Sequence, residues 1–161
     1  MKRRLAPLLP LLSACLLFAL SACDGGSSGS GDPTQVSYAA ALGVDLGAMN
    51  RSESGLYTQD LAVGTGATEV SIGRYLEVHY TGWLPDGTQF DSSRTSNKPF
   101  EFRFGYDRVI AGWEEGLIGM KAGGKRRLVI PSTLGYGAYG SPPAIPPHSV
   151  LVFDVEVLTA R

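Results

Sequence analysis

Alternating apolar and polar residues mark most of the chain after residue 55 as strands. The clearest run covers residues 75–84, where apolar side chains occupy every second position at Leu76, Val78 and Tyr80. Because successive side chains of a strand point to opposite faces, this apolar set, Tyr80 included, is predicted to face a core. Runs of the same kind predict further strands at residues 56–63, 89–91, 100–104, 125–131 and 149–158.

One segment has the periodicity of a helix instead. Trp113, Leu117 and Met120 recur at i, i+4 and i+7, which places them on one face of a short helix. Glu114 and Glu115 fall in its first turn, where the positive end of the helix dipole favours acidic residues. The chain is therefore predicted to form an α+β fold, in which a curled antiparallel sheet of about five strands wraps over one short α-helix.

The segment between the last two predicted strands is a long loop. Residues 134–148 contain four prolines, three glycines and two tyrosines, a composition that a central strand does not tolerate. Loops of this length in a compact domain are usually functional. Because this loop is aromatic and stiffened by proline, we expect it to form one wall of a pocket.

The N-terminus has the features of an export signal. Residues 2–4 are basic, and the apolar run at 11–22 is too short to span a bilayer comfortably. Residues 20–23, Leu-Ser-Ala-Cys, resemble the lipobox of bacterial lipoprotein signals, in which the chain is cut before the cysteine and the cysteine is acylated. The polar stretch that follows favours this interpretation over an ordinary cleaved signal peptide, and Pro7 and Pro10 argue against an uncleaved anchor.

These features divide the chain into three predicted parts. Residues 1–22 form a lipoprotein signal peptide, and residues 52–161 form the globular domain. Between them, residues 23–51 comprise the lipidated Cys23, a flexible Gly/Ser tether through Pro33 and a short, frayed N-terminal extension. Such a protein would be anchored by lipid in the bacterial cell envelope and face the periplasm, with the choice between inner and outer membrane left open.

Composition and charge exclude several classes of function. Cleavage would remove Cys15 and acylation would use Cys23, so no thiol would remain for a disulfide. Loss of the basic residues at 2–4 leaves 11 basic against 15 acidic residues, a net charge of −4 that does not suit nucleic acid. A metal site is not expected, since His79 and His148 are the only histidines. The glycine-rich stretches lack the Lys-Ser/Thr pair of a phosphate loop, and no serine-nucleophile motif is present.

What remains is a set of mostly apolar residues with one acid, spread over the predicted strands, the helix and the long loop. It comprises Tyr80, Phe90, Asp91, Phe100, Val109, Ile110, Trp113, Tyr136, Ile145 and Phe153. Each of these side chains could be part of the core, as large aromatic residues usually are. A single pocket with the helix as its floor would, however, draw its walls from all of these elements.

Seven short blocks resemble the FKBP-type peptidyl-prolyl cis-trans isomerases, in the same order and at similar spacing. They are residues 78–82 (VHYTG), 90–93 (FDSS), 97–100 (NKPF), 109–116 (VIAGWEEG), 136–137 (YG), 145–148 (IPPH) and 151–156 (LVFDVE). The resemblance covers roughly residues 52–161. It implies an enzyme that catalyses rotation about X-Pro peptide bonds of polypeptides without cofactor or metal, and that binds rapamycin-class macrolides.

The resemblance also implies a role for each pocket residue. Trp113 would be the floor on which a substrate proline ring rests. The backbone N–H of Ile110 and the hydroxyl of Tyr136 would donate hydrogen bonds to substrate carbonyls, and Asp91 would hold a polar network beside Tyr80. The walls would be formed by Tyr80, Phe90, Phe100, Val109 and Phe153, and Ile145 would close the far side from the loop.

Three positions depart from the usual pattern of this family. Ser96 stands where an arginine often contacts Asp91 and Tyr80, so we expect a buried Asp91 with fewer partners than usual. In the long loop, Ser141 and Ala144 replace a histidine and a larger aliphatic residue. These two changes alter the contacts that the loop can make with a substrate.

Isomerisation of X-Pro bonds during the folding of envelope proteins is the favoured function, since no block of the family pattern is missing. The same pocket would also serve a chaperone module that binds proline peptides without turnover. A purely structural lipoprotein would bind no ligand there. An assay of turnover on a proline-containing peptide separates the first two interpretations.

Overall fold

The computed structural model describes residues 30–161. The predicted signal peptide, Cys23 and most of the predicted tether lie outside the described residues. Within the described part, no helix has the length and apolar character needed to cross a membrane.

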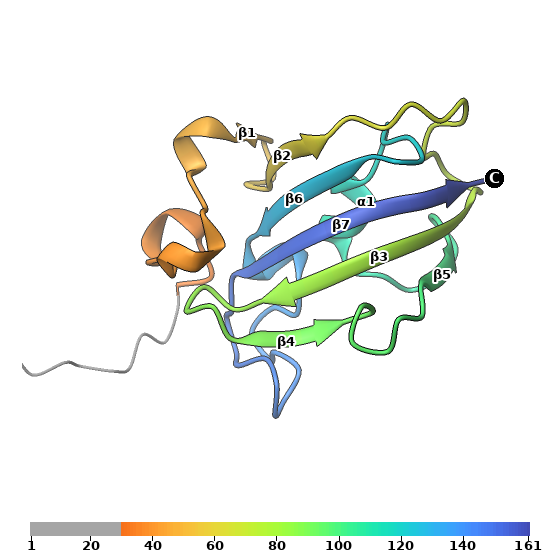
Figure 1. Cartoon of the computed structure of the whole chain (residues 1–161). Helices are drawn as coiled ribbons and strands as arrows, with labels where there is room; N and C mark the ends of the chain where they lie inside the picture. Colours follow the sequence, from red (N-terminus) through yellow and green to blue (C-terminus); the bar gives the residue numbers. More distant parts are fainter. Residues whose placement is uncertain (1–29) are drawn as a thin grey trace, which may run out of the picture.

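Seven strands form one antiparallel sheet, which confirms the predicted fold class (Figure 1). Its order is β1-β2-β6-β7-β3-β4, and β5 pairs with β3 beside β4. The strands are β1 Asn50–Arg51, β2 Tyr57–Ala62, β3 Tyr75–Trp83, β4 Gln89–Ser92, β5 Phe100–Arg103, β6 Lys125–Ile130 and β7 Leu151–Ala160. The sheet has more strands than the five or so expected, and the two-residue β1, which pairs with β2 at one end, is the strand that no predicted segment covers.

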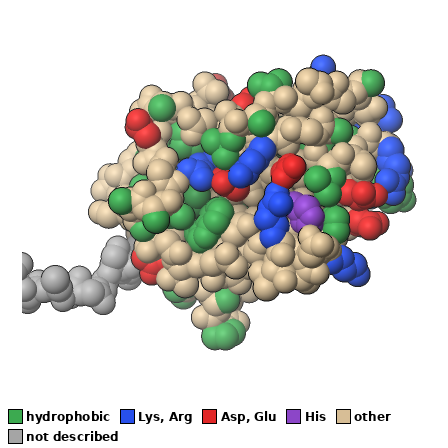
Figure 2. All heavy atoms as spheres, viewed as in Figure 1, with side chains coloured by type: hydrophobic (Ala, Val, Ile, Leu, Met, Phe, Trp, Pro, Cys, Tyr) green, Lys and Arg blue, Asp and Glu red, His purple; other side chains and the backbone are tan. Residues whose placement is uncertain are grey.

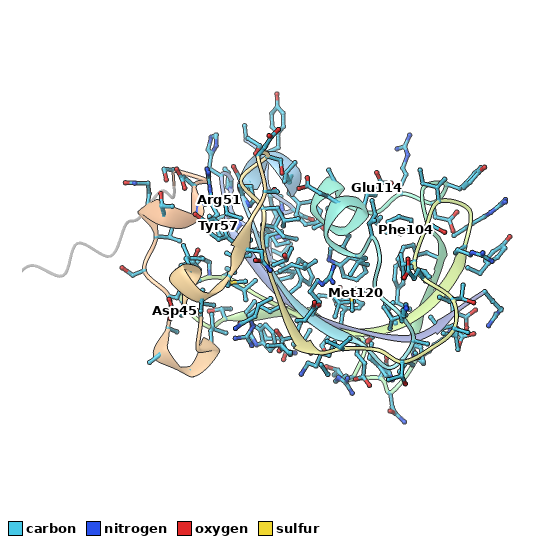
Figure 3. All side chains as sticks on the ribbon, turned by 90° about the horizontal axis from the view of Figure 1, so that it is seen from above. Asp45, Arg51, Tyr57, Phe104, Glu114 and Met120 are labelled. Carbon is cyan, nitrogen blue, oxygen red and sulfur yellow. The ribbon has the colours of Figure 1, made fainter. Side chains whose placement is uncertain are left out.

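The helix α1, Ala111–Gly116, crosses the concave face of the sheet. Its first turn approaches β6 so closely that a Cβ at Gly112 would lie 2.5 Å from Cγ2 of Ile130. The helix is shorter than its apolar face suggested, since it ends at Gly116, with Leu117 as its C-cap residue and Met120 beyond it. Both side chains are nevertheless buried, and Figure 3 shows side chains filling the space between α1 and the sheet.

The inward-facing residues of the long strands form the main core. Leu76 and Val78 of β3 alternate with outward-facing polar residues, as the sequence predicted, and both are buried. Leu128 and Ile130 contribute from β6, and Trp113 joins them from the helix. Burial of these side chains supplies most of the favourable free energy of folding, at about 25 cal/mol for each Å² of apolar surface removed from water.

Residues 31–49 pack against the outer face of the sheet, where the sequence suggested a tether and a frayed segment. Three short 3₁₀ helices form there, Pro33–Gln35, Ala40–Leu42 and Leu46–Ala48. The reason lies in strands β6 and β7, whose Val129 and Val152 point outward and need an apolar cover, which Leu42 and its neighbours provide. The packed chain begins at the buried Gly31, whose carbonyl accepts a hydrogen bond from the backbone of Ser132.

Ion pairs cover the rest of the outer face. The guanidinium of Arg127 donates two hydrogen bonds to the carboxylate of Asp154, at 2.7 and 3.0 Å, across the β6–β7 pair. Lys125 approaches the same carboxylate at 3.5 Å, and Arg94 pairs with Glu156. Figure 2 shows this face, with basic and acidic side chains next to one another. Charged side chains thus pair over the central strands, and the apolar cluster of the outer face lies beneath residues 31–49.

Replacing Leu42 by alanine tests whether the N-terminal extension contributes to folding. We expect the free energy of unfolding to fall by about 2–4 kcal/mol, because the change opens a cavity over Val129 and Val152. Isomerase activity should survive below the new melting temperature, since the extension packs on the face opposite the helix. Chemical denaturation measures the loss, with Leu61→Ala on the exposed surface of β2 as the matched control. Equal losses for the two variants would contradict a stabilising role for the extension.

Candidate active site

A cavity of about 440 Å³ opens on the concave side, between the start of α1, the sheet and the long loop. Nine of the ten predicted site residues line it, together with one residue that was not predicted. The lining residues are Tyr80, Phe90, Asp91, Phe100, Arg108, Val109, Ile110, Trp113, Tyr136 and Phe153. Segments far apart in the chain therefore meet at one site, as a pocket over the helix requires.

Trp113 is both a core residue and the base of the cavity. Its side chain is only 5% exposed and belongs to the main core cluster. The ring stands edge-on to those of Tyr80 and Phe153, with centroids 5.2 and 5.4 Å apart. Such pairs add about 0.5–1.5 kcal/mol each to the free energy gained by burial. Because several rings hold the indole from below and from the sides, it forms a stiff apolar surface.

The aromatic walls fit together because one residue of β3 has no side chain. At Gly82, a Cβ would lie 2.6 Å from the ring of Phe90 and 2.7 Å from the ring of Phe153. These two rings instead meet edge to face, with centroids 5.4 Å apart. Phe100 completes the wall from β5 and packs edge-on against Tyr80 at 6.1 Å.

Tyr80 and Asp91 form the polar edge of the cavity. The Tyr80 hydroxyl donates to Oδ2 of Asp91 at 2.6 Å. The expectation that Asp91 is buried was wrong, because β4 lies at the edge of the sheet and leaves this carboxylate exposed to solvent. Ser96 gives Asp91 no support, since its hydroxyl donates to the carbonyl of Ser93 at 3.3 Å. In the described residues, the Tyr80 hydroxyl is the one hydrogen-bond donor to the Asp91 side chain.

The two tyrosines of the site hold their protons more firmly than a tyrosine in water. Burial, followed by the hydrogen bond to Asp91, raises the pKa of Tyr80 well above its usual value of 10.0. Burial and then the nearby charge of Asp91 also raise the pKa of Tyr136. Both phenols therefore remain hydrogen-bond donors throughout the neutral range.

The backbone N–H of Ile110 and the hydroxyl of Tyr136 are cavity donors without a partner in the part of the chain that the structure describes, as is the buried Nε1–H of Trp113. The backbone N–H of Ile110 has no acceptor, whereas its carbonyl accepts from Trp113 at the start of α1. The Tyr136 hydroxyl is likewise free of hydrogen bonds within residues 30–161, and this side chain is 41% exposed. Both groups can donate to the carbonyl oxygens of a bound peptide.

The structure differs from the sequence-based site at two residues. Ile145 does not line the cavity, because it is 4% exposed and packs in the main core, while its backbone pairs with that of Ser141. Arg108, which was not predicted, does line it. The sequence signal for Arg108 was its position directly before Val109, but a charged residue does not fit a pattern of apolar wall residues.

Metal chemistry has no visible basis within residues 30–161. No group of three His, Cys, Asp or Glu side chains in that range could hold a metal ion. His79 instead shares a hydrogen bond with the Ser93 hydroxyl at 3.0 Å, away from the cavity floor. The cavity itself presents aromatic rings and a few hydrogen-bond donors.

Comparison with known proteins agrees with this description. Residues 66–158 match the family described as FKBP-type peptidyl-prolyl cis-trans isomerase. An FK506-binding protein of Neisseria meningitidis serogroup B is 52% identical over 104 residues, which cover 65% of this chain and 94% of the relative. The human peptidyl-prolyl cis-trans isomerase FKBP2 is 58% identical over 86 residues, 53% of this chain and 61% of the relative. The crystal structure of FkpA from Escherichia coli superposes with a TM-score of 0.65 at 45% identity, covering 71% of this chain and 52% of that one.

A curled sheet over one short helix, with an aromatic cavity between them, is the architecture of the FKBP fold. The chain belongs to the family of FKBP-type peptidyl-prolyl cis-trans isomerases. It is thus an isomerase of X-Pro peptide bonds, as the seven sequence blocks implied.

Replacing Asp91 by leucine tests the polar edge of the cavity. We expect kcat/KM to fall by about tenfold, the equivalent of one hydrogen bond to a charged group. The domain should still fold, since Asp91 is exposed. A peptide isomerisation assay measures the loss, with Glu53→Leu, another exposed acid, as the control. Unchanged turnover would mean that Asp91 has no part in the reaction.

The pH profile of the same variant shows how Asp91 acts. In the unchanged protein, turnover should stay flat from neutral to about pH 9, because a pKa raised above 10.0 keeps Tyr80 protonated. The protonated phenol of Tyr80 stabilises the folded protein at pH values below 10.0. This contribution to folding stability is lost as the pH rises through the folded-state pKa of Tyr80. Since Asp91 helps to raise that pKa, Asp91→Leu should move the alkaline decline to lower pH.

Proposed function

We propose that the cavity catalyses isomerisation without covalent chemistry, with the substrate proline ring on Trp113. The observation that carries this proposal is the apolar cavity over a buried indole, with the unpartnered N–H of Ile110 and hydroxyl of Tyr136 at its edge. These donors would hold carbonyl oxygens of the substrate while Phe90, Phe100, Val109 and Phe153 enclose the ring.

The physical chemistry of the peptide bond supports this mechanism. Rotation of an X-Pro bond passes through a twisted amide about 18–20 kcal/mol above the planar form, because resonance is lost. The twisted amide separates less charge than the planar one, so transfer from water to an apolar cavity favours it over the ground state. Binding that is stronger in the transition state than in the ground state accelerates the reaction. Donors already in position add to this preference without further reorganisation.

The same cavity is proposed to bind macrolides of the FK506 and rapamycin class. A relative 52% identical to this chain is named an FK506-binding protein, and the aromatic residues that line the cavity suit a large apolar ring. Such a ligand would occupy the site of the proline ring and inhibit turnover.

The cellular role that we propose is assistance to the folding of envelope proteins by a lipid-anchored isomerase facing the periplasm. The support comes from the sequence alone, in the basic residues at 2–4, the short apolar run and the Leu-Ser-Ala-Cys pattern that ends at Cys23. One acyl chain binds membranes only marginally, so stable attachment would need multiple acylation at this cysteine.

Fluorescence of Trp113 tests the proposed floor. Binding of a proline peptide or of FK506 should change its emission, because the ligand replaces water in the cavity over the indole. Trp83, which packs against the outer-face cluster, is the other indole and is removed by Trp83→Phe. Trp113→Leu should lower kcat/KM and ligand affinity together by about three- to tenfold, as expected for the loss of an aromatic surface.

Truncation to alanine is unsuitable here, because Trp113→Ala would cost about 3–5 kcal/mol and could unfold the domain. Full activity of a folded Trp113→Leu protein would overturn the proposed floor. Binding of the peptide without any turnover in the unchanged protein would instead favour a chaperone module.

Cell fractionation tests the proposed anchor. Cys23→Ala should release the protein from the membrane fraction or leave it as an uncut precursor, with the isomerase activity of the folded domain retained. Mass spectrometry of the N-terminus checks for the acyl groups. If correctly cut Cys23→Ala protein stayed on the membrane, the lipobox interpretation would be wrong.

A further inference from the structure

The cations of the described chain fall into two groups. Without residues 2–4, 11 of the 14 lysines and arginines lie within residues 30–161. Six of these form ion pairs with carboxylates, and two more, Arg51 and Arg103, lie over tyrosine rings. In this part of the chain, Arg74, Lys98 and Arg108 are left with neither kind of partner.

Two of these three free cations lie at the substrate site. Arg108 lines the proline cavity itself. Lys98 lines a second cavity of about 530 Å³, which continues the first because both include Tyr80, Asp91 and Phe100. Arg74 lines neither of the two cavities.

The acids nearby form no ion pair with these cations in the described residues. Asp107, next to Arg108 in the chain, accepts the backbone N–H of Arg103 at 2.5 Å. Asp91 accepts the phenol of Tyr80, as described above. Within residues 30–161, neither carboxylate forms an ion pair with Arg108 or Lys98.

Glu101 also lines the second cavity, and within residues 30–161 its carboxylate forms no ion pair. It lies opposite Glu77 in the β3–β5 pair, and the carboxylate of Glu77 accepts a hydrogen bond from Arg161 at 2.7 Å. The acids at the site keep their negative charge, but within the described residues none of them forms an ion pair with Arg108 or Lys98.

We propose that Arg108 and Lys98 select polypeptide substrates that carry a glutamate or aspartate next to the proline. The inference rests on the proposed function, because a proline ring on Trp113 brings its neighbouring residues over the edge of the cavity. A substrate carboxylate there would gain a partner that the folded protein leaves free. Since both cations are exposed, the gain is modest and sensitive to salt.

Two sets of short peptides test the proposal. In one set the residue before the proline is Glu, Gln or Lys, and in the other set the residue after it is varied in the same way. In at least one of the two sets, kcat/KM should be about two- to fivefold higher for the Glu peptide than for the Gln peptide. This is the range expected of an exposed ion pair. The Lys peptide should be the slowest, and the differences should vanish near about 1 M salt.

Variants assign the effect to the two side chains. Arg108→Gln should reduce the ratio of the Glu to the Gln peptide, and Arg108→Gln combined with Lys98→Gln should abolish it. Arg74→Gln removes the same charge away from both cavities and should leave the ratio unchanged. Because all three side chains are exposed, thermal unfolding should show folded proteins of similar stability.

The outcomes separate this inference from the function on which it rests. Turnover of the Gln peptide tests the proposed function, whereas the ratios within one protein test the charge preference. Titration of the same peptides against the fluorescence of Trp113 measures that preference even without turnover. The proposal would be overturned by equal kcat/KM values for the Glu, Gln and Lys peptides, or by a preference for the Lys peptides through Asp91 and Glu101. It would also be overturned if the Glu-to-Gln ratio survived in the double variant.

Discussion

The packing of one indole between the core and the cavity is the interaction on which the site depends. The rings of Tyr80 and Phe153 hold Trp113 edge-on. The indole can contact these rings because α1 lies close against β6 at Gly112. A looser helix would let the ring move and open the cavity to water. The stability of the core and the shape of the floor are therefore one property of this protein, since the same contacts produce both.

Strand β3 places its apolar side chains on the face with the cavity and its polar side chains on the outer face. Its inward set ends in Tyr80 and Gly82, the first a wall of the cavity and the second the space into which Phe90 and Phe153 fit. Its outward residues lie on the face where ion pairs such as Arg127–Asp154 spread between the strands. Apolar contact thus dominates on the concave side, and charge on the outer side, where the exposed pair Arg94–Glu156 adds little to stability.

Much of the fold and most of the site were predictable, because they depend on patterns of apolar residues that are local or repeat along the chain. Alternation in residues 75–84 identified β3 and the face to which Tyr80 belongs, and the spacing of Trp113, Leu117 and Met120 identified the buried side of the helix. The seven sequence blocks then assigned nine of the ten lining residues of the cavity correctly. Residues 31–49 were less predictable, because their short turns are stabilised by the outward valines of β6 and β7 rather than by their own propensity.

By itself, the sequence determined which residues are apolar, in which period they recur, and therefore the class of fold and the family. Only the tertiary structure decided how exposed each side chain is and which partner it has. Asp91 is exposed because β4 happens to form an edge, Ile145 is buried because the long loop folds back on itself, and Arg108 is free because Asp107 turns to the backbone of Arg103. Burial and pairing depend on which distant segments meet, and no local pattern along the chain records that.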